Sequence, residues 1–318
     1  MTALTAPRTQ AFQWRPFFQK YGLALSFLIL CLGLTLASDR FLTADNLINI
    51  LRQSAVNGII AVGMMLVILT RGIDLSVGST LAFSTIIATD LLRQGTSPIL
   101  AILAAIVVGI IVGGINGLLV SRAHIPPFIA TLGMMTLVRG LAFSYTEGQP
   151  ITGLPEAFRW LGTGSIGPIP APVIVMALVF LAGFILLDYT PFGRHIFAYG
   201  DNAKAALMTG LPTRRIVLFV YIAAGALSAL AGVVLIGRLN SAAPSTGAGY
   251  EFDAIAAVVV GGTSFDGGEG SIWGTLLGVL LIAVLNNGLN LLNVPSPVQD
   301  VVKGAVIALA LLLYKAIR

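Results

Sequence analysis

Long apolar runs separated by short polar breaks fill almost the whole chain. Eight runs are clear, and each is close to the roughly 20 mostly apolar residues that a helix needs to cross a bilayer. They lie at residues 21–38, 51–70, 99–120, 128–146, 171–188, 216–237, 271–292 and 301–316. Two weaker runs, 75–92 and 253–266, are short, and the pattern leaves open whether they cross fully or form re-entrant helices lined by protein. The pattern predicts an all-α polytopic membrane protein with about ten transmembrane helices.

The composition agrees with a membrane protein. Of the 318 residues, 57% are hydrophobic and only 10% are charged, whereas a soluble domain has about a quarter of its residues charged. The net charge of +5 does not indicate nucleic-acid binding, because the basic residues lie mostly in short loops beside apolar runs. The single cysteine, Cys31, lies in an apolar run, so no disulfide framework or cysteine-based metal site is expected.

The distribution of Lys and Arg predicts the orientation, since cytoplasmic loops carry an excess of both. With ten spans and a cytoplasmic N-terminus, most of the 18 Lys and Arg residues fall in or near the cytosol. The largest outer loop, 147–170, holds only Arg159 and is rich in Pro and Gly, which predicts an irregular surface. We therefore expect one transmembrane domain over residues 1–318, with a cytoplasmic N-terminal tail at 1–20 and a cytoplasmic C-terminus.

The largest expected inner loop, 189–215, is a basic, polar island between two long apolar runs. Its positively charged residues and its histidine are Arg194, His195, Lys204, Arg214 and Arg215. Gly210 is expected to close a short helix in this loop as a left-handed cap. A membrane protein with one large positive loop in mid-chain offers a surface to a partner in the cytosol, so we interpret the chain as one subunit of a larger assembly.

Three asparagines, Asn286, Asn290 and Asn293, share one face of an expected membrane helix, with Asn287 beside them. Side-chain amides in hydrocarbon need hydrogen-bond partners, so this stripe should face protein or water. Two interpretations stay open, namely hydrogen bonding between helices and a polar wall along the path of an uncharged, hydroxyl-rich solute. The candidate pathway residues are Asn57, Asn286, Asn287 and Asn290.

Two glycine-containing breaks, 71–78 and 261–270, lie on the expected cytosolic side. Neither fits the GxxxxGK[ST] pattern of a phosphate-binding loop, and that pattern occurs nowhere in the chain. The breaks are interpreted as tight turns, with a gate hinge or a partner contact as the alternative. The candidate gate or turn residues are Asp74, Ser76, Gly261 and Gly262. Asp74 either pairs with Arg71 or caps the helix that follows, for which Ser76 is the alternative cap.

Two sets of glycines recur at four-residue steps. They are Gly109, Gly113, Gly117 and Gly270, Gly274, Gly278. On a membrane helix this spacing makes a smooth groove into which another helix can pack closely. The two sets predict dense helix packing and say nothing about function.

Little in the sequence indicates an enzyme or a metal site. The only two histidines are His124 and His195, and there is no HExxH or GxSxG motif. An ion-coupled secondary transporter of a small polar solute is the alternative to a subunit driven by a partner, and it would need an acid near the membrane midplane. The candidates for that acid are Asp90 and Asp253, both near the ends of runs, and Asp253 more simply marks a helix N-terminus that favours negative charge.

Five motifs, in order and at family-like spacing, resemble the membrane permease subunits of bacterial ABC sugar importers, and most of all the ribose permeases among them. They lie at residues 68–79, 127–133, 192–206, 249–264 and 285–292. The resemblance covers nearly the whole chain from about residue 20. One departure is Arg71, which stands where a small residue is usual before Gly72, and it puts the local surface of that turn in doubt.

The resemblance implies ten transmembrane helices of the type II importer kind, a second copy of the permease in a homodimer, and surrounding lipid of the bacterial inner membrane. It also implies a cytoplasmic ABC ATPase that uses ATP and Mg, and a periplasmic sugar-binding protein. The permease would bind no cofactor of its own and no nucleic acid. The residues implied to couple it to the ATPase are Gly200, Asp201, Asn202, Ala205, Ala206 and Gly210.

Overall fold

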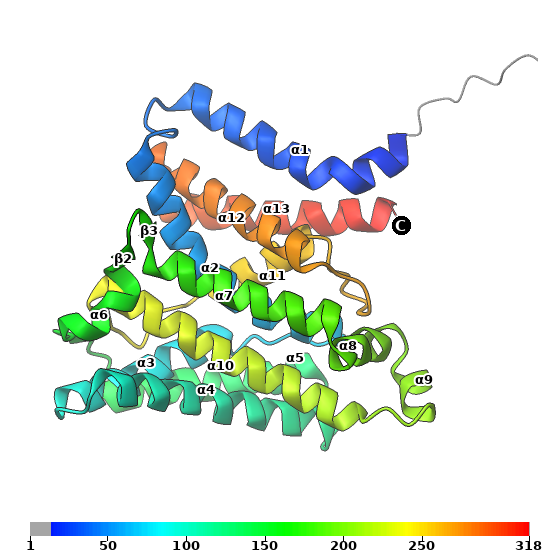
Figure 1. Cartoon of the computed structure of the whole chain (residues 1–318), viewed down its shortest axis with the longest axis horizontal. Coiled ribbons are helices and arrows are strands. Elements are labelled where there is room, and N and C mark those ends of the chain that lie inside the picture. The colour runs from blue at the N-terminus through cyan, green and yellow to red at the C-terminus, as the bar shows by residue number, and fades with distance from the viewer. Residues whose placement is uncertain (1–13, 318) are drawn as a thin grey trace, which may run out of the picture.

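Ten long or apolar helices form the body of the protein in the computed structural model, which describes the backbone of residues 14–317 and the side chains of residues 22–306 and Ala308 (Figure 1). Most of the expected N-terminal tail lies outside these residues. The ten helices are α1 (Trp14–Ala37), α2 (Ala44–Leu69), α3 (Val77–Arg93), α4 (Pro98–Ser121), α5 (Pro127–Thr146), α7 (Ala171–Phe184), α10 (Thr213–Leu239), α11 (Tyr250–Val260), α12 (Ile272–Leu291) and α13 (Ser296–Ile317).

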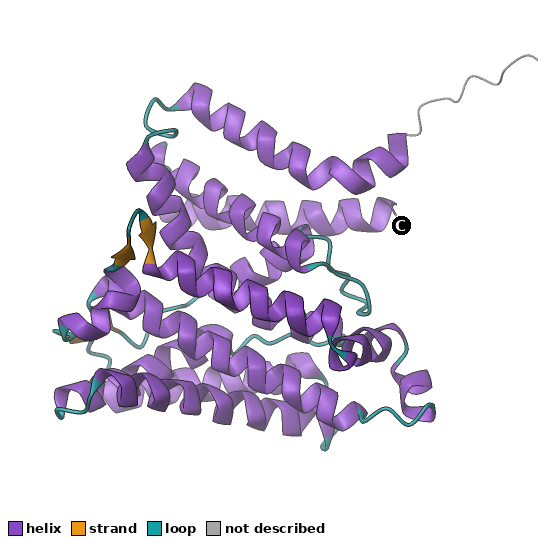
Figure 2. Cartoon of the chain, in the orientation of Figure 1, coloured by secondary structure: helices purple, strands orange, loops and turns teal. Residues whose placement is uncertain are grey.

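Each of the ten apolar runs overlaps one of these helices, and the all-α class is confirmed (Figure 2). Among the described residues, six helices are long and apolar enough to cross a membrane, namely α2, α4, α5, α7 with its continuation to Tyr189, α10 and α12. The run 253–266 extends past its helix, because α11 ends at Val260, where Gly261 packs against α12 and Gly262 takes φ +90°. Eleven residues of helix rise only about 16 Å, well short of a hydrocarbon core of about 30 Å.

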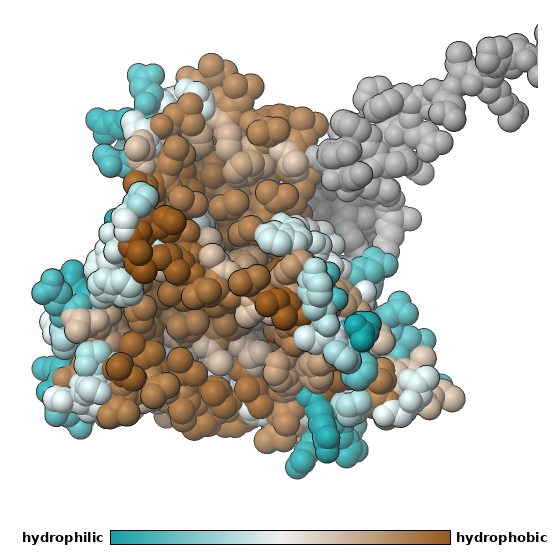
Figure 3. All heavy atoms as spheres, viewed as in Figure 1, coloured by the Kyte–Doolittle hydropathy of each residue, from teal (hydrophilic) through white to brown (hydrophobic). Residues whose placement is uncertain are grey.

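The connections gather at two opposite ends of the helix bundle (Figure 1). At one end lie α6 (Glu156–Thr163), β2 (Ser165–Ile166) and β3 (Ile169–Pro170), and at the other lie α8 (Pro191–Asp201) and α9 (Ala203–Met208). Figure 3 shows apolar side chains over the length of the helices and polar side chains at the two ends. This is the distribution expected when hydrocarbon surrounds the middle of a protein and water its ends.

Segment 147–170 is more ordered than the irregular surface that its Pro and Gly content predicts. Besides α6 it contains β1 (Ile151–Thr152), which pairs antiparallel with β4 (Ser241–Ala242), and the β2–β3 hairpin. Phe158 of α6 is fully buried, and Gly162 of α6 packs directly against the backbone of Gly237 in α10. One aromatic anchor and one glycine contact therefore fix a segment whose composition alone suggests a loop.

The helix α2 is the centre of the fold, and it is buried almost continuously from Ser54 to Leu69. It contacts α7, α10, α11 and α12. By contrast, α4 presents apolar side chains such as Ile99 and Ile111 to the outside, as a lipid-facing helix does. One of the two most apolar helices is thus an outer one, because lipid rather than protein covers it.

Glycines bring the helices into close contact, as the two sets at four-residue steps predict. Gly109 and Gly113 of α4 meet the backbone of α10 at Gly225 and Tyr221, so that an added Cβ would overlap backbone atoms. In the second set, the glycines at 274 and 278 pack α12 against α11 in the same way. Gly270 is the exception, because α12 begins only at Ile272.

Candidate functional site

Two short helices, α8 and α9, occupy the basic island that the sequence singles out. The Thr190 hydroxyl accepts a hydrogen bond of 3.0 Å from the Gly193 N–H and caps the start of α8. The Asn202 side chain accepts one of 3.0 Å from the Ala205 N–H, so this residue ends α8 and caps α9. Gly210 follows with φ +81°, which confirms the expected left-handed cap. We call residues 191–210 the coupling segment, after the role that the resemblance implies for residues within it.

The coupling segment has a buried side and an exposed side. Ile196 and Gly200 of α8 and Ala206 of α9 are buried against the rest of the protein. On α9, by contrast, Leu207 is 63% exposed and Met208 is 80% exposed. Two large apolar side chains at a water-facing end of the molecule are a feature of surfaces that bind another protein.

The C-terminal end of α8 lies directly on the C-terminal end of α2. At Gly200 an added Cβ would overlap the Leu69 carbonyl oxygen and the Gly268 backbone, so only glycine fits. The Gly268 N–H in turn donates a hydrogen bond of 3.1 Å to the Leu69 oxygen. Three segments that lie far apart in the sequence therefore meet at one point, which we call the coupling junction.

Arg71 fastens the coupling junction. Its Nε donates a hydrogen bond of 2.6 Å to the Gly200 oxygen, and its Nη2 donates one of 2.5 Å to the Asp201 oxygen. These carbonyls end α8, where the partial negative charge of a helix favours a cation. The resemblance marks Arg71 only as a local departure, whereas in the structure its side chain joins the end of α2 to the end of α8. The residue also has φ +62°, a left-handed conformation that non-glycine residues seldom adopt.

The break that begins at Arg71 continues as non-helical backbone to the start of α3. The Asp74 carboxylate accepts hydrogen bonds from the Ser76 N–H, at 2.9 Å, and from the Ser76 hydroxyl, at 2.6 Å. The Asn116 amide of α4 donates a further bond of 2.9 Å to the Ser76 oxygen. Asp74 therefore fixes the first turn of α3, and its expected alternative, a pair with Arg71, is replaced by the bonds of Arg71 to α8.

The second break, 261–270, is a chain of tight turns. Gly261 lies against the Gly274 carbonyl of α12, where an added Cβ would come within 2.6 Å of that oxygen. Gly262, Gly267 and Gly268 all have φ above +70°. The geometry explains Gly261 and Gly262 as turn residues, and through Gly268 the same break reaches the coupling junction. A gating role for either break stays a prediction.

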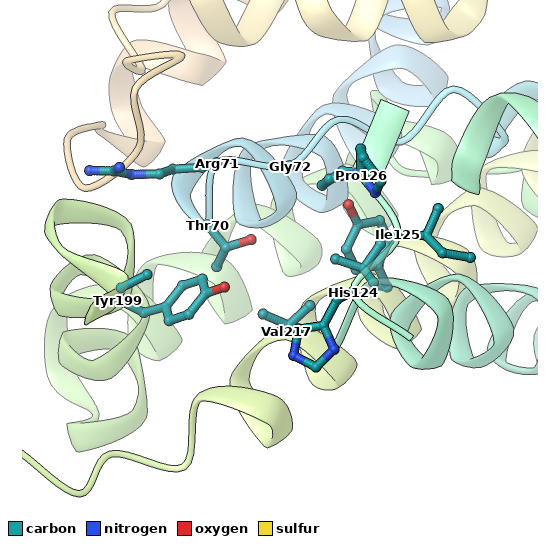
Figure 4. Close-up of a pocket in the computed structure, with 12 residues that line it drawn as sticks. Thr70, Arg71, Gly72, His124, Ile125, Pro126, Tyr199 and Val217 are labelled. Atoms are coloured by element: carbon teal, nitrogen blue, oxygen red, sulfur yellow. The ribbon is translucent and has the colours of Figure 1, made fainter. Parts of the chain in front are cut away.

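A cavity of about 290 Å³ lies beside the coupling segment, between α8, the break after α2 and the loop that precedes α5 (Figure 4). The Thr70 and Tyr199 side chains point toward it, and His124 lies at its opposite edge. Burial raises the pKa of the Tyr199 phenol above its usual value, and the positive charge of the neighbouring Arg71 offsets part of this rise. Among the described residues, no group of three His, Cys, Asp or Glu side chains could hold a metal ion.

The asparagines of α12 reach different neighbours and do not line one wall together. Asn287 and Asn46 of α2 exchange two side-chain hydrogen bonds, of 3.1 and 2.8 Å. Asn290 accepts one of 2.9 Å from Gln299 of α13. For Asn287 and Asn290 the structure thus favours bonding between helices, while the pathway role of Asn57 and Asn286 stays a prediction.

Arg139 is a half-buried cation that sequence reasoning did not single out. Its Nη1 donates hydrogen bonds to the carbonyls of Pro244, at 2.6 Å, and Thr246, at 2.8 Å, and thereby holds the irregular segment before α11. Glu251 and Asp253 follow in the first turn of α11, as expected for acids at a helix N-terminus. An arginine inside an apolar run was the available signal, because such a residue needs buried partners.

Comparisons with known proteins identify the family. Residues 46–311 match the family model described as the branched-chain amino acid transport system / permease component. The chain is 51% identical to the ribose import permease protein RbsC of Bacillus subtilis (strain 168), over 93% of this chain and 92% of that one. It is 45% identical to RbsC of Escherichia coli (strain K12), over 96% and 98%. Identity to the D-allose transport system permease protein AlsC of the same strain is 37%, over 98% and 96%.

No solved structure matches the chain. The family model nevertheless covers most of the sequence, and each of these relatives aligns with it over nearly its whole length. With six helices able to cross a bilayer, the protein is a multi-pass membrane protein, and the chain belongs to this family of transport permeases.

Proposed function

We propose that the protein is the membrane-spanning permease subunit of an ATP-driven ABC importer that carries a monosaccharide, first of all ribose, across the bacterial inner membrane. The observation that carries this proposal is the full-length likeness, at 51% and 45% identity, to permeases named for ribose import. Relatives named for D-allose and L-arabinose transport are 37% identical. The decline in identity from ribose to the other sugars favours ribose as the substrate.

The proposed topology has ten membrane-crossing helices and both termini in the cytoplasm. The helices α3, with 17 residues, and α11, with 11, are too short to cross alone. Non-helical segments complete their paths, at 70–76 before α3 and 240–249 before α11. Irregular backbone is tolerated at membrane depth where protein surrounds it. Protein side chains do bond to both segments here. Asn116 donates a hydrogen bond to Ser76 in the first segment, and Arg139 donates hydrogen bonds to backbone carbonyls of the second.

In this proposal the coupling segment docks into a cytoplasmic ATPase, which alone binds and hydrolyses ATP with Mg. Leu207 and Met208 would enter a cleft of the ATPase, and the buried side of α8 would pass its displacement to the bundle. The proposed coupling residues act in different ways. Gly200 permits the contact with α2, the Asp201 oxygen accepts the bond from Arg71, Asn202 shapes the corner between α8 and α9, Ala205 and Ala206 belong to α9, and Gly210 ends the segment.

The sugar would come from a periplasmic binding protein and pass between two copies of this chain. Closure of the ATPase would move α8, and the coupling junction would carry this movement to α2 and to the break 261–270. Rigid elements that are packed together transmit such shifts as discrete rearrangements. Selectivity would then lie mainly with the binding protein, since a weakly binding path suits rapid release.

The test is uptake of radiolabelled ribose by cells that lack their own ribose permease and contain the ATPase and binding protein. We expect uptake with the native chain, and none with Gly210→Pro, because proline cannot adopt φ +81°, or with Asp201→Arg. Both variants should reach the membrane in normal amounts. Arg93→Gln, an exposed change at the other end of the molecule, is the control and should transport normally.

Normal uptake by Gly210→Pro and Asp201→Arg would contradict the coupling role. Depletion of ATP with the ion gradients held constant separates the proposal from an ion-coupled secondary transporter. Uptake should then stop, whereas an ion-coupled transporter would continue. If another sugar competes with ribose more strongly than ribose itself, the substrate assignment is wrong while the coupling mechanism stands.

A further inference from the structure

A second cavity, of about 230 Å³, lies between the C-terminal end of α4 and the N-terminal end of α10. Three arginines line it, namely Arg122, which directly follows α4, and both Arg214 and Arg215 from α10, together with Ser121 and Leu218. No acidic residue lines it. Within the described part of the chain, the three guanidinium groups make no ion pair and no side-chain hydrogen bond. Neither the coupling junction nor the proposed sugar path uses this cavity.

The position of Arg214 and Arg215 is unfavourable without a negatively charged neighbour. They lie in the first turn of α10, a helix of 27 residues that has no acidic residue in that turn and no side-chain cap at Pro212. A helix N-terminus carries a partial positive charge, which repels cations and attracts anions. An excess of arginine at the cytoplasmic side would orient the protein in the membrane, but orientation does not require three arginines around one cavity.

The surface next to the cavity is apolar and exposed. On α4, Ile111, Ile115 and Leu118 lie on the same helical face as Arg122. Each of the three side chains is at least 40% exposed. On α10, Phe219 lies one turn from Arg215 and is 39% exposed. The arginine-lined cavity therefore lies at the end of an exposed apolar surface. Figure 3 shows the same general pattern, with apolar side chains over the length of the helices and polar ones at the ends of the molecule.

We infer that this cavity binds the phosphate headgroup of an anionic phospholipid, whose acyl chains lie along the exposed faces of α4 and α10. Guanidinium groups bind phosphate oxygens through paired, charge-assisted hydrogen bonds. Basic pockets between membrane helices on the cytoplasmic side are suited to lipid headgroups. A soluble phosphate would use the arginines but not the apolar faces. The site goes beyond transport of the sugar, and only its assignment to the cytoplasmic leaflet rests on the proposed orientation.

The first experiment uses the purified full chain in a neutral detergent and measures its thermal unfolding. Phosphatidylglycerol should raise the unfolding temperature in a saturable way, because a ligand that binds only the folded state stabilises it. Phosphatidylcholine, of similar chain length, and inorganic phosphate are the comparisons and should have much weaker effects. An equal effect of phosphatidylcholine would overturn the site, and an equal effect of inorganic phosphate would show that its ligand is a soluble anion.

The second experiment compares two double variants that each remove two charges from the same end of the molecule. Arg214→Gln with Arg215→Gln should weaken phosphatidylglycerol binding about 30-fold, given roughly 1 kcal/mol for each basic residue. Arg194→Gln with Lys204→Gln, both exposed on the coupling segment, should leave lipid binding unchanged. Equal losses in both variants would reduce the effect to general charge and overturn the inference.

The native chain gives the lipid selectivity without any variant, so the inference stays testable even if the arginine variants fold poorly. The ATPase is the other candidate occupant of this cavity. If Arg214→Gln with Arg215→Gln binds phosphatidylglycerol normally but no longer retains the ATPase, the cavity belongs to that interface and the lipid site is wrong. Because lipid binding is measured without sugar or ATP, its outcome is independent of the transport assay.

Discussion

Glycines allow close backbone contact in two regions of this protein, with different consequences. At the crossing of α4 and α10, Gly109 and Gly113 bring two long membrane helices together. At the coupling junction, Gly200 brings a short peripheral helix onto the end of α2, and Arg71 adds polar bonds. The first contact lies within the helix bundle and holds it together, whereas the second lies at its edge and joins it to a segment that a partner would move. The same packing device thus serves stability in one place and transmission in the other.

The largest expected effect is on transport, from Gly200→Ala. The added methyl group would overlap the Leu69 carbonyl oxygen, and α8, a short helix at the edge of the bundle, can relieve this overlap by moving away from the end of α2. We expect ribose uptake to fall by about tenfold or more, while the thermal stability of the purified chain changes little. Gly133→Ala is the matched control, because nothing lies within 4 Å of the added Cβ. Normal uptake by Gly200→Ala would show that the junction does not transmit motion.

The next effect is on stability, from Gly113→Ala in α4. The new Cβ would overlap the Tyr221 backbone, so the helices must separate, and we expect a loss of about 1–3 kcal/mol. This should appear as a lower unfolding temperature and a smaller amount of protein in the membrane. Gly114→Ala, on the next residue, meets only one side-chain atom at 3.8 Å and is the control. Equal stability of the two variants would remove the distinction between the crossing and the rest of α4.

The smallest effect is expected from Arg71→Gly, which sharpens the comparison. Glycine adopts the φ of +62° without strain, so the backbone can keep its path while both bonds to α8 are lost. Because Arg71 is exposed at its tip, each bond contributes less than a buried charged one. We expect uptake to fall only a few-fold, with unchanged or higher thermal stability. A fall in stability that accounts for the whole loss of uptake would assign Arg71 to folding and not to coupling.

The helices were predictable from the sequence because hydrocarbon requires long apolar stretches, and each of the ten runs overlaps a helix. The end of α11 at Val260 was not, because it is set by the contact of Gly261 with α12 and by the positive φ of Gly262, which depend on packing and backbone conformation. The burial of Phe158 was not predictable for a related reason, because it depends on the tertiary contact between α6 and α10 and not on the local sequence.

The coupling segment was found from its charge and its Gly210 cap, both of which are local features. The part played by Arg71 was missed because its partners lie 129 and 130 residues further along the chain. The asparagines of α12 were recognised as polar, but only the packing decides that Asn287 faces Asn46 and that Asn290 faces α13. Sequence periodicity places residues on a face and does not identify the neighbouring helix.

The burial of α2 has a consequence for how transport responds to its motor. Protein packs around this helix from Ser54 to Leu69. A displacement of its end at Leu69 therefore cannot be taken up by local bending of the helix. Densely packed cores switch between discrete arrangements and do not deform continuously. We therefore expect single transporters to show abrupt openings of fixed size, with no partly open leak at low ATP.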